Sequence, residues 1–265
     1  VPISYSGRSY DEGKKISWYH FFVALFWLMR QKVITKDIPL HILLEMRHMR
    51  NYNRWLLSLM KDFIGKNILE IGSGIGNIAK YFLSSEQLVL TDISGQNIFY
   101  LKNCFREYPN VKILKHDIVD PNQGILKDFK FDTILCLNVL EHIEDDRKAL
   151  GNVYNLMGEN TCLLMVVPAL PSLMGSLDSA LGHHRRYTRE GLSALLDSSN
   201  LAVERIEYLN FLGALGWFVN SKILKRKTFS RLQLWFFEKI FWLIKAERYF
   251  KLPFGLDLFA VCRKK

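Results

Sequence analysis

The stretch that decides the fold is ILEIGSGIGN, residues Ile68–Asn77. Ile68–Ile71 predicts a buried strand, and the three glycines after it form a loop in which the backbone can turn sharply and approach a ligand. The stretch IAKYFL that follows predicts a helix whose first N–H groups point at this loop. The next apolar run, LVLTDIS, contains Asp92, which is placed to accept the hydroxyls of a ribose. A tight strand–helix turn without a ligand is the alternative interpretation.

The glycine spacing separates two kinds of cofactor. A dinucleotide site uses G-x-G-x-x-G, but here the third glycine comes one residue early and Asn77 takes the place of the expected glycine. The segment E-I-G-S-G-I-G resembles the first motif of the class I S-adenosylmethionine-dependent methyltransferases. That resemblance implies S-adenosylmethionine as the cofactor, with Glu70 holding its methionine end through the loop. The implied contacts in this part of the chain are Glu70, Gly72, Ser73, Gly74, Gly76, Asp92 and Ile93.

Three further segments predict the strands that follow in the sheet. LKHDIVD (Leu114–Asp120) ends a third strand, and the resemblance implies adenine contacts from Asp117 and Ile118, although Asp117 also suits a turn. FDTILCLNVLEHIEDD, residues 131–146, predicts a fourth strand, and by resemblance its N-V-L-E-H-I segment lies beside the cofactor, with contacts from Asn138 and Val139. TCLLMVVP, residues 161–168, is a fifth, fully apolar strand. Such continuous apolar runs are typical of a parallel sheet covered on both faces.

The most polar cluster follows the fifth strand, in GHHRRYT before a helix capped at Thr188. Ligands of open α/β sheets bind outside the strand ends, where this loop is predicted to lie. An H-x-R-R-Y segment at this place also resembles the methyltransferase family. A histidine, with a pKa near 6.5, suits removal of a hydroxyl proton, and the arginines suit a phosphate or carboxylate of the acceptor. The candidate bases are His183, His184 and His142, and the candidate acceptor-binding residues are Arg185, Arg186 and Tyr187. A capping loop with solvated basic residues is the alternative.

Residues 37–66 have helical periodicity, and Gly65 is expected to cap the helix. M-R-N-Y-N-R-W-L within this segment resembles the N-terminal helix that covers the cofactor in relatives attached to glycan-assembly genes. Arg50, Tyr52 and Asn53 would then line the pocket, with Tyr52 as a candidate substrate contact. A solvated helix face is the alternative.

The first thirty-six residues resemble another family. V-P-I-S-Y, R-x-Y and E-G-K-K-I-S-W resemble the carboxyl end of family 2 glycosyltransferases of the dolichyl-phosphate-mannose-synthase type. Residues 1–36 are therefore expected to be a glycosyltransferase-like tail with an amphipathic helix, and 37–265 a methyltransferase domain, as in a fusion of the two enzymes. The apolar part of the helix, Trp18–Met29, is too short to span a bilayer and is expected either to lie at a membrane surface or to pack on the glycosyltransferase domain.

The end of the chain predicts a sixth strand at 201–209 and a seventh at 255–265, with an insert at 210–254. The insert reads as two aromatic, aliphatic helices with interleaved Lys and Arg, neither of them long and uncharged enough to span a membrane. An apolar, basic-rimmed insert favours a lipid-linked acceptor or a membrane surface, and a dimer interface is an equal alternative.

Composition narrows the function classes. The chain has 265 residues, 49% of them hydrophobic, and a net charge of +10, which favours anionic partners such as a membrane face or a lipid phosphate. Its four cysteines show no C-x-x-C pair and no metal spacing, so no metal site is predicted and a cytoplasmic setting is implied. N-V-L-E stands where base-amino methylases carry N/D-P-P-[YF], and no nucleic-acid partner is expected.

The sequence therefore predicts a Rossmann-like α/β methyltransferase with a doubly wound, seven-stranded sheet, the last strand antiparallel by resemblance. The leading acceptor is a sugar or related group on a lipid-linked or cell-surface glycan, which implies polysaccharide biosynthesis at the inner face of the membrane. A methyltransferase of a lipid quinone or other small hydrophobic phenol is the first alternative. A non-catalytic module that scaffolds a membrane glycosyltransferase is the second.

Overall fold

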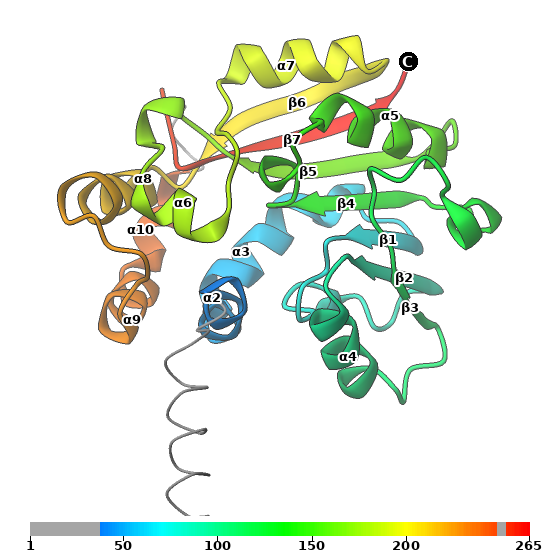
Figure 1. Cartoon of the computed structure of the whole chain (residues 1–265), viewed down its shortest axis with the longest axis horizontal. Helices are drawn as coiled ribbons and strands as arrows, with labels where there is room; N and C mark the ends of the chain where they lie inside the picture. The colour runs from blue at the N-terminus through cyan, green and yellow to red at the C-terminus, as the bar shows by residue number, and fades with distance from the viewer. Residues whose placement is uncertain (1–37, 248–252) are drawn as a thin grey trace, which may run out of the picture.

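The predicted strands form one seven-stranded sheet in the order β3-β2-β1-β4-β5-β7-β6. The computed structural model describes residues 38–247 and 253–265 (Figure 1). The predicted strands agree closely with those observed, which are β1 Asn67–Ile71, β2 Gln87–Asp92, β3 Val111–Lys115, β4 Thr133–Leu137, β5 Cys162–Pro168, β6 Leu201–Leu209 and β7 Asp257–Lys264.

Strands β1 to β5 pair in parallel, whereas β7 pairs antiparallel with both β5 and β6. The expected fold, a doubly wound sheet whose last strand is antiparallel, is confirmed. Because parallel strands end at one edge, the loops after β1, β2, β4 and β5 gather there. Those loops carry most of the predicted site residues.

Helices cover both faces of the sheet because alternate residues of each strand point to opposite faces. Leu69 and Ile71 belong to a core that α5 (Asp146–Leu156) and α7 (Arg189–Ser198) complete. Ile68 and Leu90 belong to the opposite core, where α3 (Arg50–Met60), α4 (Gly95–Cys104) and α10 (Phe241–Ala246) pack. Figure 1 shows this three-layer arrangement. Three of the four cysteines are buried, as expected of small apolar residues.

Two expected helices are wrong in detail. The segment after the glycine loop forms turns and a short 3₁₀ helix, Ala79–Tyr81. This helix ends after one turn, where the Phe82 N–H donates to the Ala79 carbonyl. The helix expected across 37–66 is divided into α2 (Ile38–Met46) and α3 by tight backbone bonds at residues 47–50. Gly65 is not its cap, since α3 ends at Met60; a Cβ on Gly65 would instead collide with Asp132.

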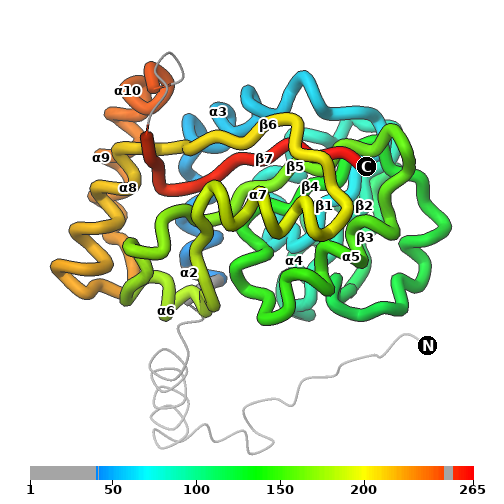
Figure 2. Tube along the Cα trace, turned by 90° about the horizontal axis from the view of Figure 1, so that it is seen from above, coloured from blue at the N-terminus to red at the C-terminus, as the bar shows by residue number. Residues whose placement is uncertain are grey.

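In the described part of the insert, residues 210–247, three α-helices replace the two expected: α8 (Phe211–Phe218), which continues into a π-helical turn at Val219–Ile223, α9 (Arg231–Lys239) and α10. The second expected helix breaks at Ile240, and the break lets Phe241 and Ile244 bury against α3. The Glu238 carboxylate accepts backbone N–H bonds from Asn51 and Tyr52, and so caps α3 from the insert. Figure 2 shows these three helices gathered at one end of the molecule.

No helix among residues 38–247 and 253–265 combines the length and the apolar character needed to cross a bilayer. The predicted glycosyltransferase-like tail, residues 1–36, lies outside the described residues, as does the start of the predicted methyltransferase domain at residue 37.

Candidate active site

The glycine loop has the backbone that its sequence predicts. Gly72, Gly74 and Gly76 all have positive φ, between 55° and 78°, a region that residues with a Cβ rarely adopt. A Cβ on Gly72 would collide with Val139, and one on Gly74 would lie 3.2 Å from the Leu43 side chain. The glycine loop therefore lies tightly between α2 and the segment after β4. It tolerates no side chain at Gly72 or Gly74.

Asp92 stands at the end of β2 and holds the loop in place. One carboxylate oxygen accepts the Gly74 N–H at 2.8 Å, and the other accepts the Ser94 N–H at 2.8 Å and the Asn97 amide at 3.2 Å. A carboxylate offers about four acceptor positions, so capacity for a ribose hydroxyl remains. The sequence motif did not reveal that Asp92 also shapes the glycine loop.

Glu70, at the end of β1, is buried, and its Oε2 has no hydrogen-bond partner among the described residues. Burial, with Asp92 nearby, raises the pKa of this carboxyl to about 8. Its backbone carbonyl accepts the Ser73 hydroxyl at 3.0 Å, which fixes the first turn of the loop. A buried carboxylate oxygen without a partner at this place suits a cationic group of a ligand.

The remaining predicted cofactor residues occupy the same edge of the sheet. Ile93 is 65% exposed next to Asp92, whereas Ile118 is buried in the core. Asp117 is exposed and accepts the Val119 N–H at 2.9 Å, which is the turn geometry expected of the alternative interpretation. An adenine contact from Asp117 stays a prediction.

Asn138 follows β4 with φ 53°, and its N–H donates to the carbonyl of Val166. This left-handed residue turns the chain out of the sheet and carries Val139 against Gly72. The N-V-L-E-H-I segment therefore lies beside the glycine loop, as the sequence predicts.

Asp178, in α6 (Ser176–Leu181), organises the loop after β5 and was not singled out in the sequence. Its fully buried carboxylate accepts bonds from the Arg186 Nε at 2.7 Å, the His183 Nδ1 at 3.0 Å, the Trp217 Nε1 at 3.1 Å and the Gly175 N–H at 2.9 Å. Although burial opposes it, these contacts with His183 and Arg186 hold the pKa of Asp178 below its usual value. A lone Asp in LDSALG carries no signal of this role.

The predicted acceptor-binding residues have partners within the fold. Arg186 is buried between Asp178 and the Trp217 ring, 4.7 Å from its guanidinium carbon to the ring centroid. Arg185 pairs with Asp146 at 2.8 Å and keeps 35% of its side chain exposed. The Tyr187 hydroxyl donates to the same Asp146 at 3.1 Å. These contacts give the three residues a structural role, and their binding of an acceptor stays a prediction.

The α3 residues predicted to line the pocket differ among themselves. Tyr52 and Asn53 are buried, while Arg50 is exposed. The Tyr52 ring packs against Phe241 at 6.2 Å, and burial raises its pKa. Tyr52 therefore contributes to the junction between α3 and the insert, and no described contact shows it facing an acceptor.

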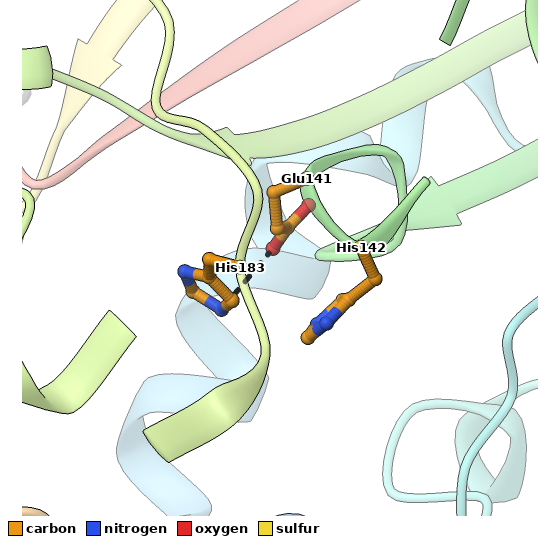
Figure 3. Close-up of side chains that lie close together, drawn as sticks. All are labelled: Glu141, His142 and His183. Atoms are coloured by element: carbon orange, nitrogen blue, oxygen red, sulfur yellow. Dashed lines mark ion pairs between the residues drawn. The ribbon is translucent and has the colours of Figure 1, made fainter. Parts of the chain in front are cut away.

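Two of the three candidate bases lie together with Glu141 (Figure 3). The His183 Nε2 is 4.0 Å from a Glu141 oxygen, and the His142 and His183 rings meet edge to face with centroids 4.8 Å apart. Glu141 is fully buried, and neither of its carboxylate oxygens has a hydrogen-bond partner in the described part of the chain. Burial raises the pKa of Glu141 to about 8. His184 is exposed, and its backbone N–H donates to the Glu141 carbonyl.

Comparison with known proteins agrees with this geometry. Residues 69–163 match a family model described as a methyltransferase domain. The fold resembles a putative sarcosine dimethylglycine methyltransferase from Galdieria sulphuraria, with a TM-score of 0.56, 13% identity and coverage of 81% of this chain and 85% of that one. It also resembles the N-methyltransferase NodS from Bradyrhizobium japonicum, solved with S-adenosyl-L-homocysteine, with a TM-score of 0.52, 15% identity and coverage of 81% and 86%. Residues 69–163 therefore match a methyltransferase domain, within a fold that S-adenosylmethionine-dependent methyltransferases share.

A curated relative of the methyltransferase domain is a juvenile hormone acid O-methyltransferase from Drosophila melanogaster, 29% identical over 111 residues. The aligned segment is 39% of this chain and spans only 37% of that relative.

The residues of the methyltransferase domain fit S-adenosylmethionine. The unpaired Oε2 of Glu70 suits the cofactor's ammonium group, and the positive φ of Gly72, Gly74 and Gly76 keeps the adjoining loop free of side chains. The exposed Ile93 beside Asp92 offers an apolar surface next to a ribose acceptor. The individual contacts of these residues with the cofactor remain predictions.

Proposed function

We propose that this methyltransferase domain methylates an oxygen of a sugar, or of a related group, on a lipid-linked or cell-surface glycan intermediate. The observation that carries the proposal is the insert 210–254, which joins an exposed apolar and basic surface to the side chains of the candidate active site. The proposal places the reaction at the inner face of a membrane.

Direct contacts connect the insert to the site. Trp217 of α8 donates its indole N–H to Asp178, the residue that holds His183 and Arg186. The Leu177 N–H donates to the Ser221 hydroxyl at 3.3 Å, so α6 is joined to the π-helical turn Val219–Ile223 that follows α8. A molecule bound on the insert would therefore lie next to the loop that carries the candidate bases.

The outer surface of the insert is unusually apolar for a monomeric surface. Its exposed large side chains are Leu215, Phe218, Val219, Ile223, Leu224, Leu232, Trp235, Phe236, Trp242 and Leu243. Exposed basic residues stand among them at Lys222, Lys225, Arg226 and Lys227. Aromatic rings at the headgroup boundary combined with basic side chains on anionic lipid are typical of peripheral membrane binding.

The chemistry follows from the cofactor and the loop. S-adenosylmethionine supplies an electrophilic methyl carbon on a sulfonium. An acceptor hydroxyl oxygen forms a bond to this carbon as the carbon–sulfur bond breaks and its electron pair stays on sulfur. The hydroxyl proton passes to a base, for which His183, His184 and His142 are the candidates. Alignment of oxygen, carbon and sulfur by the glycine loop and the segment after β4 supplies most of the rate.

An oxygen acceptor is supported by the curated relative, whose name describes an acid O-methyltransferase. The same relative favours a second candidate function, methylation of a small hydrophobic acceptor such as a lipid quinone or another phenol. In that case the apolar insert would hold the acceptor itself rather than a lipid surface.

An experiment separates the two candidates. The purified chain is incubated with S-adenosylmethionine carrying a radiolabelled methyl group and with lipid-linked glycan extracts, water-soluble glycans or simple phenols. Alkali-stable label in the saccharide part of the lipid-linked fraction supports the proposal, and Gly74→Val is the inactive control. Label only in the phenols would support the second candidate, and no label in any fraction would contradict both.

The proposal includes a glycosyltransferase as partner, because residues 1–36 resemble the tail of one. The tail, if attached to such an enzyme, would bring the methyltransferase domain to newly made lipid-linked products. To test this arrangement, a chain that carries a glycosyltransferase domain before residue 1 is purified, and the lipid-linked product that co-purifies with it is examined for methylation.

A further inference from the structure

We propose that Glu141, His142 and His183 form a binding site for a divalent transition-metal ion. One carboxylate and two imidazoles meet there from two different loops, the first after β4 and the second after α6 (Figure 3). This part of the inference rests on the side chains alone; what the ion does in catalysis rests on the proposed function.

The spacing of the three side chains suits one ion. Each residue offers one ligand atom, and these atoms all lie within 4.8 Å of one another. Zinc–nitrogen and zinc–oxygen bonds are about 2.0–2.2 Å long, so two ligand atoms of a tetrahedral ion lie about 3.4 Å apart. The His183 Nε2 and the Glu141 oxygen lie 4.0 Å apart, so a closing movement of roughly 0.6–1.4 Å between pairs of ligand atoms would bring the three side chains onto one ion.

The buried carboxylate of Glu141 is the second, independent observation. Its side chain is fully buried, and both oxygens lack a hydrogen-bond partner among residues 38–247 and 253–265. Buried polar groups in proteins are normally hydrogen-bonded, and buried carboxylates are paired or coordinate metals. One of these oxygens faces His183, so a cation between the two side chains would provide the missing partner (Figure 3).

A supporting shell fixes the His183 ring. Its Nδ1 is bonded to the Asp178 carboxylate at 3.0 Å, which leaves Nε2 for the ion. A carboxylate behind a metal-bound histidine is the usual arrangement, because it sets the tautomer and the ring orientation. Asp178 is itself held by Arg186 and Trp217, so the ring direction is determined by a buried network.

The ligand set indicates the kind of ion. Two imidazoles and one carboxylate suit Zn²⁺, Mn²⁺, Fe²⁺ or Co²⁺ better than Ca²⁺ or Mg²⁺, which prefer oxygen ligands. Three protein ligands leave at least one coordination position open, as in catalytic rather than structural sites. Under the proposed function, the acceptor hydroxyl takes this position and its pKa falls, so its proton leaves more easily. The proton then goes to His184 or to water, since His142 and His183 are occupied as ligands.

Metal binding is tested without cofactor or acceptor. The purified chain, stripped with a chelator, is titrated with Co²⁺ and followed by visible absorption, and bound Zn²⁺ and Mn²⁺ are counted by equilibrium dialysis. We expect one ion per chain. Glu141→Gln and His183→Ala should each weaken binding by at least about 100-fold, because each variant removes a ligand.

Two variants keep the test decisive. His142→Ala removes a ligand that is not part of the buried core, and it remains informative if the Glu141 variant fails to fold. His48→Ala removes an exposed histidine outside the cluster and should bind Co²⁺ like the unaltered chain. Absence of stoichiometric Co²⁺ binding, or binding that His142→Ala and His183→Ala leave unchanged, would overturn the proposal.

The metal site and the proposed function fail in different ways. Stoichiometric Co²⁺ binding that is lost in the ligand variants supports the site even if no glycan is methylated. Methyl transfer that continues at full rate in the chelated protein and in His142→Ala would overturn the catalytic role of the ion while leaving the glycan acceptor intact.

Discussion

Asp178→Asn should strongly destabilise the protein, because this residue is the anion that compensates a buried cation. The Arg186 side chain is 1% exposed and its Nε lies 2.7 Å from an Asp178 oxygen. Asparagine keeps the size and one oxygen, but it removes the charge. With its oxygen kept toward Arg186, its amide N–H₂ must also face two donors, the Trp217 indole N–H and the Gly175 N–H, which both now bond to the second Asp178 oxygen.

The magnitude follows from these contacts. Removing one partner of a buried ion pair costs about 3–5 kcal/mol, since it leaves an uncompensated charge. In a protein of this size each kcal/mol corresponds to roughly 2–4 °C, so the midpoint of thermal unfolding should fall by about 6–20 °C. Urea unfolding followed by circular dichroism measures the free energy, and calorimetry measures the midpoint.

Two comparisons isolate the effect of the charge. Asp197→Asn removes a carboxylate that is 74% exposed and pairs with Lys265, and it should cost no more than about 1 kcal/mol. Adding Arg186→Met to Asp178→Asn should recover part of the lost stability, because a well-packed apolar residue needs no counter-charge. A loss below about 1 kcal/mol in the single variant, equal to that of Asp197→Asn, would refute the reasoning.

Further predictions concern the cofactor, the buried carboxyl and the membrane. Asp92→Ala should weaken binding of S-adenosyl-L-homocysteine at least about tenfold in calorimetry, because hydrogen bonds to a charged group contribute about 1.5–3 kcal/mol each; unchanged affinity in a folded variant would remove Asp92 from the site. Gly74→Val should abolish that binding, since φ of 55° and the Leu43 side chain exclude valine, and wild-type affinity would count against the glycine-loop assignment. The pKa of Glu141 is raised to about 8, so the folded protein holds its proton more tightly than the unfolded chain does. The unfolding free energy of the metal-free protein should therefore fall as pH rises from about 4.5 to 8. Urea titrations of Glu141→Gln should show a weaker pH dependence, and a pH dependence equal to that of the unaltered chain would contradict the assignment. The chain should co-sediment with anionic vesicles and do so less at high salt, and full recovery in the supernatant at low salt would leave the insert as a protein–protein interface.

The strands and the glycine loop could be predicted from the sequence because their signals are local. A buried parallel strand needs a continuous apolar run, and Ile68–Ile71 and Cys162–Pro168 supply such runs whatever surrounds them. The loop needs residues that accept positive φ, and glycine at 72, 74 and 76 is the local chemistry of that backbone. Asp92 follows at a spacing that the strand–loop–helix–strand unit itself sets.

Helix boundaries were less well determined because packing competes with periodicity. The pattern across Leu234–Ile244 is helical throughout, yet the chain breaks at Ile240 so that Phe241 can bury against Trp55, with ring centroids 5.7 Å apart. Likewise, the stretch after the glycine loop is apolar enough for a helix but stops as one 3₁₀ turn. In both cases tertiary contacts, which no local window contains, decided the outcome.

The chemistry of the loop after β5 was decided by the tertiary structure alone. The place of Arg186 after the fifth strand and the chemistry of its guanidinium marked it as a candidate acceptor-binding residue. The fold instead buries it on Asp178, a residue from another element that no motif indicated. Glu141 is one letter in N-V-L-E-H-I, and only the packing of the loop after α6 against this segment brings the His183 Nε2 to 4.0 Å from its buried carboxylate. The sequence by itself determined the cofactor edge of this protein, because strands, glycine turns and their spacing are local. The charge network beside that edge exists only when distant segments meet, because burial and pairing of charges are properties of the folded chain.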